Sequence, residues 1–102
     1  MTIHELKILP EYYDAVRVGD KRFEIRKNDR NFKNGDVLRL KEWDGEKYTG
    51  EEVYALVRYI LTDWQAGLKD GYCIMSIDTG MHYVPKSGEH LDISNYQKEM
   101  IV

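Results

Sequence analysis

The spacing of apolar and polar residues predicts a mainly β chain with one helix. The clearest alternation runs over residues 22–27, where Phe23 and Ile25 share one face of a strand and Glu24 and Arg26 share the other. Four further strands are predicted at residues 2–9, 36–43, 51–61 and 71–78. The strand at 51–61 is apolar on both faces, which is typical of a closed or wrapped sheet rather than one with a wet side.

One helix is predicted over residues 10–18. Pro10 suits the first helical turn, where its missing N–H costs nothing, and Glu11 follows in the turn that the helix dipole favours for acids. Gly19 is a natural stop. The order of elements, with strands far more numerous than helices, predicts a mainly β (α+β) fold, a small and mostly antiparallel barrel with this helix closing one end.

The sequence has 102 residues, a length that predicts one domain with a single modest core. Residues 1–78 hold the predicted elements and form the expected domain. Residues 79–102 contain one proline, two glycines and little periodicity, so we expect an extension that packs on the domain or is partly disordered. Its apolar end suits packing on the body or on a second copy, and we expect a monomer or weak homodimer.

Positive charge is concentrated in one segment of an acidic protein. Residues 17–41 contain nine basic and four acidic side chains, a net charge of +5, whereas the whole chain carries −3. Such segregation is a usual footprint of an anionic ligand, most often nucleic acid. The alternative, to which charge spacing alone gives equal weight, is a solvated strand face.

Composition excludes several classes of site. Cys73 is the single cysteine, so an intramolecular disulfide or a multi-cysteine zinc site is excluded, and its apolar neighbours predict a buried, inert thiol. The N-terminal sequence has no apolar signal region, and no run of 18 apolar residues is present. We therefore expect a cytoplasmic protein with no membrane partner, no metal and no cofactor.

Three sequence runs carry a family resemblance: HELKILPEYYDAVRVGDKRFEIRKNDRNFKNGDVLRLKEW, YTGEE and GLKDGYCIMSI. Together they resemble a bacterial and phage branch of unknown function within the ASCH/PUA-like superfamily, over about residues 3–78. The superfamily signature is a Gly-x-Lys turn, a Glu-x-Arg strand and a Gly-Asp pair that opens the next strand. Those positions are Gly19 and Lys21, Glu24 and Arg26, and Gly35-Asp36.

The resemblance implies a PUA-like pseudo-barrel of five to six strands with a cleft beside the helix. Members of the superfamily bind RNA or recognise a modified base, and one small branch hydrolyses N4-acetylcytidine with a Lys, a Thr and a Glu. The Lys corresponds to Lys21, but Glu24 replaces the Thr, and the late strand has no carboxylate before Asp78. These departures favour a binding module over a hydrolase.

Candidate binding residues combine that motif with charge and aromatic character. Arg26 offers a planar fork to phosphate or a base edge, and Glu24 accepts from an exocyclic amine; the alternative is a same-face ion pair. Tyr48 is singled out among the candidate stacking surfaces, for each of which core or hairpin packing is the favoured alternative; the candidates are Tyr12, Tyr13, Trp43, Tyr48 and Trp64. The complete set is His4, Lys7, Lys21, Glu24, Arg26, Lys27, Asn28, Arg30 and Tyr48. For Asp36, a role as a turn acceptor is favoured over ligand binding.

The preferred hypothesis is a module that binds RNA, single-stranded in preference, or a modified nucleotide in a basic cleft beside the helix. It predicts that Arg26→Ala and Lys21→Ala weaken binding and leave the fold intact. A small hydrolase is the alternative, with Glu24 as general base and Lys21 stabilising negative charge. A protein-binding accessory domain is the third hypothesis, motivated by the acidic remainder and the apolar C-terminus.

Overall fold

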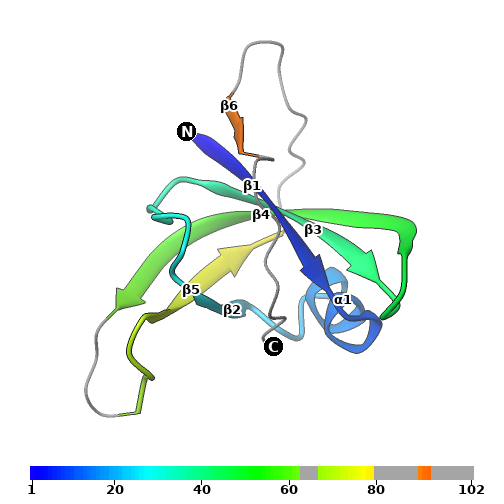
Figure 1. Ribbon diagram of the computed structural model, residues 1–102, viewed down its shortest axis with the longest axis horizontal. Coiled ribbons are helices and arrows are strands. Elements are labelled where there is room, and N and C mark those ends of the chain that lie inside the picture. Colours follow the sequence, from blue (N-terminus) through cyan, green and yellow to red (C-terminus); the bar gives the residue numbers. More distant parts are fainter. Residues whose placement is uncertain (63–66, 80–89, 93–102) are drawn as a thin grey trace.

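The strands form a single mixed sheet that curls around its own core (Figure 1). The computed structural model describes residues 1–62, 67–79 and, for the backbone, 90–92. Its elements are β1 (Thr2–Ile8), α1 (Pro10–Arg17), β2 (Phe23–Lys27), β3 (Val37–Trp43), β4 (Tyr48–Thr62), β5 (Tyr72–Asp78) and β6 (His90–Asp92). The result is a mainly β half-barrel with one short helix, which confirms the predicted fold class.

The sheet order is β2-β5-β4-β3-β1-β6. Neighbouring strands are antiparallel from β2 through β3, whereas β1 runs parallel to both β3 and β6. The parallel β1–β3 pair requires a long connection between its strands, and that connection contains α1 and β2. β1 and β2 lie towards opposite ends of the sheet order, and a side-chain hydrogen bond from β2 reaches the backbone of β1.

Irregular pairing in the long central strand contributes to the curl. The register between β4 and β5 shifts between Val57 and Tyr59, and that between β3 and β4 shifts between Lys41 and Trp43. Such bulges increase local twist and bend a strand. One face of the curled sheet thereby surrounds an apolar core whose largest members include Leu6, Leu40 and Met75.

Helix α1 packs against β3 and β4 and lies at one end of the curled sheet (Figure 1). Tyr13 and Val16 are its buried residues. Pro10 occupies the first turn, and Gly19 adopts a φ of 87° just beyond the helix end, a conformation that favours glycine. The helix that the sequence predicts at 10–18 is confirmed to within one residue.

Three details differ from expectation or lie beyond the description. β4 starts at Tyr48, not at residue 51, because Tyr48 already pairs with Trp43 across the hairpin. The strand β6 has only three residues, too few for a periodic pattern to predict it, and its pairing with β1 defines it. Of the predicted extension at 79–102, residues 80–89 and 93–102 lie outside the described residues, so its division from the domain stays a prediction.

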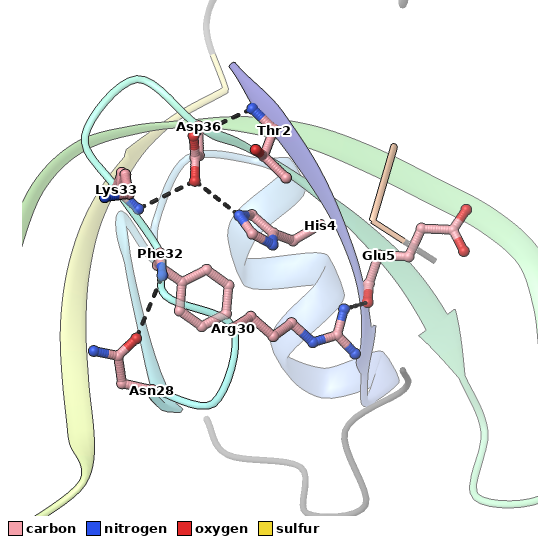
Figure 2. Close-up of polar contacts among 8 residues, drawn as sticks. All are labelled: Thr2, His4, Glu5, Asn28, Arg30, Phe32, Lys33 and Asp36. Carbon is pink, nitrogen blue, oxygen red and sulfur yellow. Dashed lines mark hydrogen bonds and ion pairs between the residues drawn. The ribbon is translucent and has the colours of Figure 1, made fainter. Parts of the chain in front are cut away.

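The connection between β2 and β3 is fastened to β1 (Figure 2). Asp36 accepts hydrogen bonds from the backbone nitrogens of Thr2 (3.2 Å) and Lys33 (3.1 Å), and from His4 Nε2 (2.8 Å). Phe32 is buried and meets the His4 ring edge-on, with centroids 4.7 Å apart. The expected role of Asp36 as a turn acceptor is therefore confirmed.

Candidate functional site

Strand β2 turns its charged face towards the core. Glu24 and Arg26 are both 0% exposed, whereas Phe23 and Lys27 on the opposite face are exposed. Period-two alternation separated these faces correctly, but the usual rule that the apolar face is buried is reversed here. The reversal is possible because the buried charges neutralise one another at close range.

Glu24 is held between two cations. Lys21 Nζ donates to one carboxylate oxygen and to the backbone oxygen of Phe23 (2.8 Å), and Arg26 Nε donates to the other carboxylate oxygen (2.8 Å). These contacts form the same-face ion pair that the sequence offered as an alternative, although inside the protein. The planar fork expected to recognise phosphate is thus engaged internally.

Two arginines also join the opposite sides of the curled sheet. Arg26 Nη2 donates to the backbone oxygen of Lys7 (2.7 Å), and Arg30 Nη1 donates to that of Glu5 (2.9 Å; Figure 2). Both acceptors belong to β1, whereas the donors come from β2 and the loop that follows it. Hydrogen bonds from a charged donor are strong, so these two side chains hold β1 close to β2 and its following loop.

A basic cleft opens beside the C-terminal end of α1. Its volume is about 530 Å³. The lining residues are Arg17, Val18, Gly19, Lys21, Arg22, Ile77, Asp78 and Thr79. Three of them are basic and one is acidic, but Lys21 is paired with Glu24, so the positive excess comes chiefly from Arg17 and Arg22. Lys21 is the member of the predicted site that lines the cleft.

A second group of predicted residues lies on the outer face of β1, β3 and β4. Lys7 Nζ is 4.4 Å from the centroid of the Trp43 ring, and Lys41 Nζ is 4.5 Å from that of Tyr48. The Tyr48 side chain is 44% exposed. Desolvation and the charge of Glu5 raise the pKa of Tyr48, so its hydroxyl remains protonated at neutral pH.

The remaining predicted residues have local structural contacts. His4 is buried against Asp36, and the Asn28 side-chain oxygen accepts from the backbone nitrogen of Phe32 (3.4 Å), as expected of turn chemistry. Lys27 is exposed next to Asn28 at the end of β2. The predicted set therefore divides among a buried ionic network, the cleft, the outer face and the fastened loop.

The predicted site set leaves out Arg17 and Arg22 in the cleft and Lys41 on the outer face, although all three were counted in the basic segment. Trp43 was considered as a stacking surface but not selected. Both arginines belong to the basic segment, and a signal was available in their positions on either side of the Gly19 turn. Lys41 and Trp43 are two residues apart on β3 and lie on the same face. Only the pairing of β3 with β1 and β4 shows that they meet Lys7 and Tyr48.

Cys73 is fully buried in the core, as the sequence predicts. Burial raises the pKa of its thiol to about 11. Deprotonation at neutral pH is therefore strongly disfavoured, which suits a packing role.

Comparison with known proteins places the chain in a family. Residues 3–77, including most of the cleft and the buried network, match the family described as "Domain of unknown function (DUF3850)". The chain belongs to the DUF3850 family. This DUF3850 domain is also 45% identical over 64 residues to an uncharacterised 12.9 kDa protein in the GpA 3′ region of Escherichia phage P2. That alignment covers 61% of this chain and 59% of the phage protein.

Over residues 1–62, 67–79 and 90–92, no helix is long and apolar enough to cross a membrane. Within the part of the chain that the structure describes, no three or more His, Cys, Asp or Glu side chains are grouped so as to hold a metal ion.

Proposed function

We propose that this DUF3850 domain binds single-stranded RNA or a modified nucleotide in the basic cleft beside α1. The observation that carries the proposal is the convergence of Arg17, Lys21 and Arg22 on one concave site in an otherwise acidic protein. The resemblance to the ASCH/PUA-like superfamily supports the same ligand class and the same place in the fold. A ligand there is recognised by charge and by the shape of the cleft.

The size and charge of the cleft suit a nucleotide. Its volume of about 530 Å³ lies within the range of small-molecule sites. The C-terminal end of a helix carries partial negative charge, so the positive field must come from side chains. Arg17 and Arg22 are exposed, and each has a planar guanidinium that can bind phosphate through two hydrogen bonds.

The structure changes which substitutions test binding. Arg26 is fully buried and donates to Glu24 and to the backbone of Lys7, so Arg26→Ala would perturb the fold. A loss of binding in that variant would therefore not show that Arg26 contacts the ligand. Arg17 and Arg22 replace it as test positions because their side chains are exposed in the cleft.

The test is an NMR amide-shift titration of the full chain with short single-stranded RNA and with modified nucleosides, at low and moderate salt. We expect shifts clustered on residues 17–22 and 77–79, and weaker binding in an Arg17→Gln/Arg22→Gln variant. The charge-matched control is Lys33→Gln/Lys69→Gln, because both lysines are exposed and neither lines the cleft. Absence of shifts with every ligand, or equal losses in the two variants, would refute the cleft as a nucleotide site.

One contact favours a second candidate function, a small hydrolase of modified nucleosides. Lys21 both lines the cleft and binds the Glu24 carboxylate, an arrangement in which Glu24 acts as general base and Lys21 stabilises developing negative charge. Glu24 is fully buried behind Lys21, which is why binding is better supported. Turnover of acylated nucleosides that disappears in Glu24→Gln would establish the hydrolase; no turnover would exclude it for those substrates.

A further inference from the structure

The outer face of β1, β3 and β4 holds a compact group of aromatic and lysine side chains away from the cleft lining. We define the aromatic–lysine platform as Lys7, Lys41, Trp43 and Tyr48. Lys7 Nζ lies 4.4 Å from the Trp43 ring centroid and 5.9 Å from that of Tyr48, so both rings share one cation. Lys41 Nζ adds a second cation 4.5 Å from Tyr48.

Strand register explains why these four side chains meet. Lys7 is the direct partner of Lys41 in the parallel β1–β3 pair, and Trp43 is the direct partner of Tyr48 across the β3–β4 hairpin. Lys41 and Trp43 are two residues apart on β3 and share its outer face. The two rings are therefore carried by paired strands of the β3–β4 hairpin, next to its register shift, and not by a long loop.

Two neighbouring acids on this face, Glu5 and Glu52, share one arginine. Arg39 donates to Glu5 (2.6 Å) and to both carboxylate oxygens of Glu52 (2.7 and 3.0 Å). The hydrogen bond from Arg39 lowers the pKa of Glu52, as expected of a stable pair. Arg39, Lys7 and Lys41 together carry three positive charges against the two of Glu5 and Glu52, a formal net charge of 3 − 2 = +1 on this part of the face.

We propose that the aromatic–lysine platform is a stacking site for the bases of single-stranded RNA, with its lysines contacting the adjacent phosphates. The inference rests on the proposed function and extends it from one nucleotide in a cleft to a longer strand that also contacts a second surface. An exposed Tyr48 ring and a partly exposed Trp43 ring, both flanked by cations, suit single strands. Each base offers a π face and each nucleotide a negative charge. A protein partner has no such repeating combination.

Binding would exchange contacts rather than add them to an empty surface. In the structure the ammonium groups of Lys7 and Lys41 cover the ring faces, and such contacts are weak at exposed sites. An incoming base takes a ring face, and the flexible lysine stem carries the ammonium to the phosphate of the same strand. Stacking and charge contact are thereby coupled at each ring.

The test uses Trp43 as its own reporter. Trp64, the other tryptophan of the two in the chain, is replaced by Phe so that emission comes from Trp43 alone. We expect short oligouridine and oligoadenosine to quench Trp43 emission, and inorganic polyphosphate of equal charge to leave it nearly unchanged. Quenching by polyphosphate to the same extent would show that charge, not stacking, is recognised, and would overturn the proposal.

Affinity measurements by fluorescence anisotropy of labelled oligouridine separate the platform from the cleft. Tyr48→Leu should weaken binding by about 5- to 100-fold, the range for loss of one stacked base. Tyr59→Leu is the matched control, since Tyr59 is an exposed β4 tyrosine outside the platform. Lys7→Gln/Lys41→Gln keeps both rings and should also weaken binding, which protects the test against a folding defect in one variant.

Each outcome decides between the two sites. Loss of affinity in the platform variants but not in Tyr59→Leu supports the platform, whether or not the Arg17→Gln/Arg22→Gln cleft variant also binds weakly. Losses in the cleft variant alone overturn the platform and leave the proposed function standing. No binding of any oligonucleotide by the unmodified chain at low salt overturns both.

Discussion

At the scale of single residues, the most unusual feature is a buried charged side chain that connects β2 to β1. Arg26 is fully buried, donates to Glu24 on its own strand and reaches the backbone of Lys7 on β1. Burying charge is costly unless each group is paired and hydrogen-bonded, and removing one partner leaves the other uncompensated. The Arg26 side chain is thus required to balance Glu24, and it also connects β2 to β1.

We predict that Arg26→Gln lowers the free energy of unfolding by about 3–5 kcal/mol, the range for breaking a buried ion pair. Glu24 would keep only Lys21, and the Lys7 carbonyl would lose its donor. Urea denaturation followed by circular dichroism measures the change. The neighbouring exposed Lys27→Gln is the control and should shift stability by less than about 0.5 kcal/mol. Equal midpoints for the two variants would contradict the structural role.

The orientation of β2 shows where sequence reasoning at this scale succeeds and where it stops. Alternation assigns Glu24 and Arg26 to one face because side chains on a strand alternate with period two. It does not show which face is inside, since that depends on Lys21 and Lys7 arriving from other elements. The predicted contact between Glu24 and Arg26 was available from spacing, whereas its burial required the tertiary fold.

At the scale of elements, the connection from β2 to β3 is anchored to β1 by one polar and one apolar side chain. Its polar anchor is Asp36, which binds backbone on its own loop and on β1, and its apolar anchor is Phe32 (Figure 2). A loop fixed at two such points is held in one conformation. This favours support of the fold as the role of the loop itself.

We predict that Asp36→Asn destabilises the protein by about 1–3 kcal/mol, because an amide offers one acceptor oxygen where the carboxylate uses two. Its NH₂ group would face a backbone donor. Hydrogen exchange should show faster exchange of the Thr2 and Lys33 amides, while the Ile77 amide, bonded to Arg22 on the far side of the sheet, stays protected. Unchanged protection at Thr2 and Lys33 would show that Asp36 is not the anchor.

Element boundaries illustrate a similar division between local and tertiary information. The helix and five strands follow from periodicity, proline and glycine, because those signals are local. β6 spans only His90–Asp92 and is defined by its parallel partner β1, a contact between the ends of the sequence. Nothing in three residues encodes such a pairing.

At the scale of the whole molecule, some side chains of the basic segment pair with acids of the protein, and others remain exposed to solvent. Lys21 and Arg26 neutralise Glu24 inside the protein, and Arg39 is committed to Glu5 and Glu52. The net +5 read from residues 17–41 therefore overstates the positive charge that a ligand meets. What remains at the cleft is chiefly Arg17 and Arg22, so any nucleic-acid affinity should be local and selective rather than that of a uniformly basic coat.

This distribution makes the salt dependence of binding a measure of which side chains neutralise phosphate. For single strands, the slope of log K against log salt concentration is about −0.7 for each phosphate neutralised. We predict that Arg17→Gln/Arg22→Gln makes the slope shallower by about 1.4, corresponding to two lost phosphate contacts. Fluorescence anisotropy of labelled oligouridine over a series of salt concentrations provides the slopes.

The charge-matched variant Lys33→Gln/Lys69→Gln decides how that result is interpreted. It changes the net charge by the same amount at exposed positions outside the cleft. If the ligand senses only the overall field of the protein, both double variants alter the slope alike. If the cleft arginines contact phosphate directly, only their removal does so, because released counterions reflect contacts rather than total charge. An unchanged slope in the arginine variant would therefore remove the cleft from the binding surface even if RNA binds elsewhere.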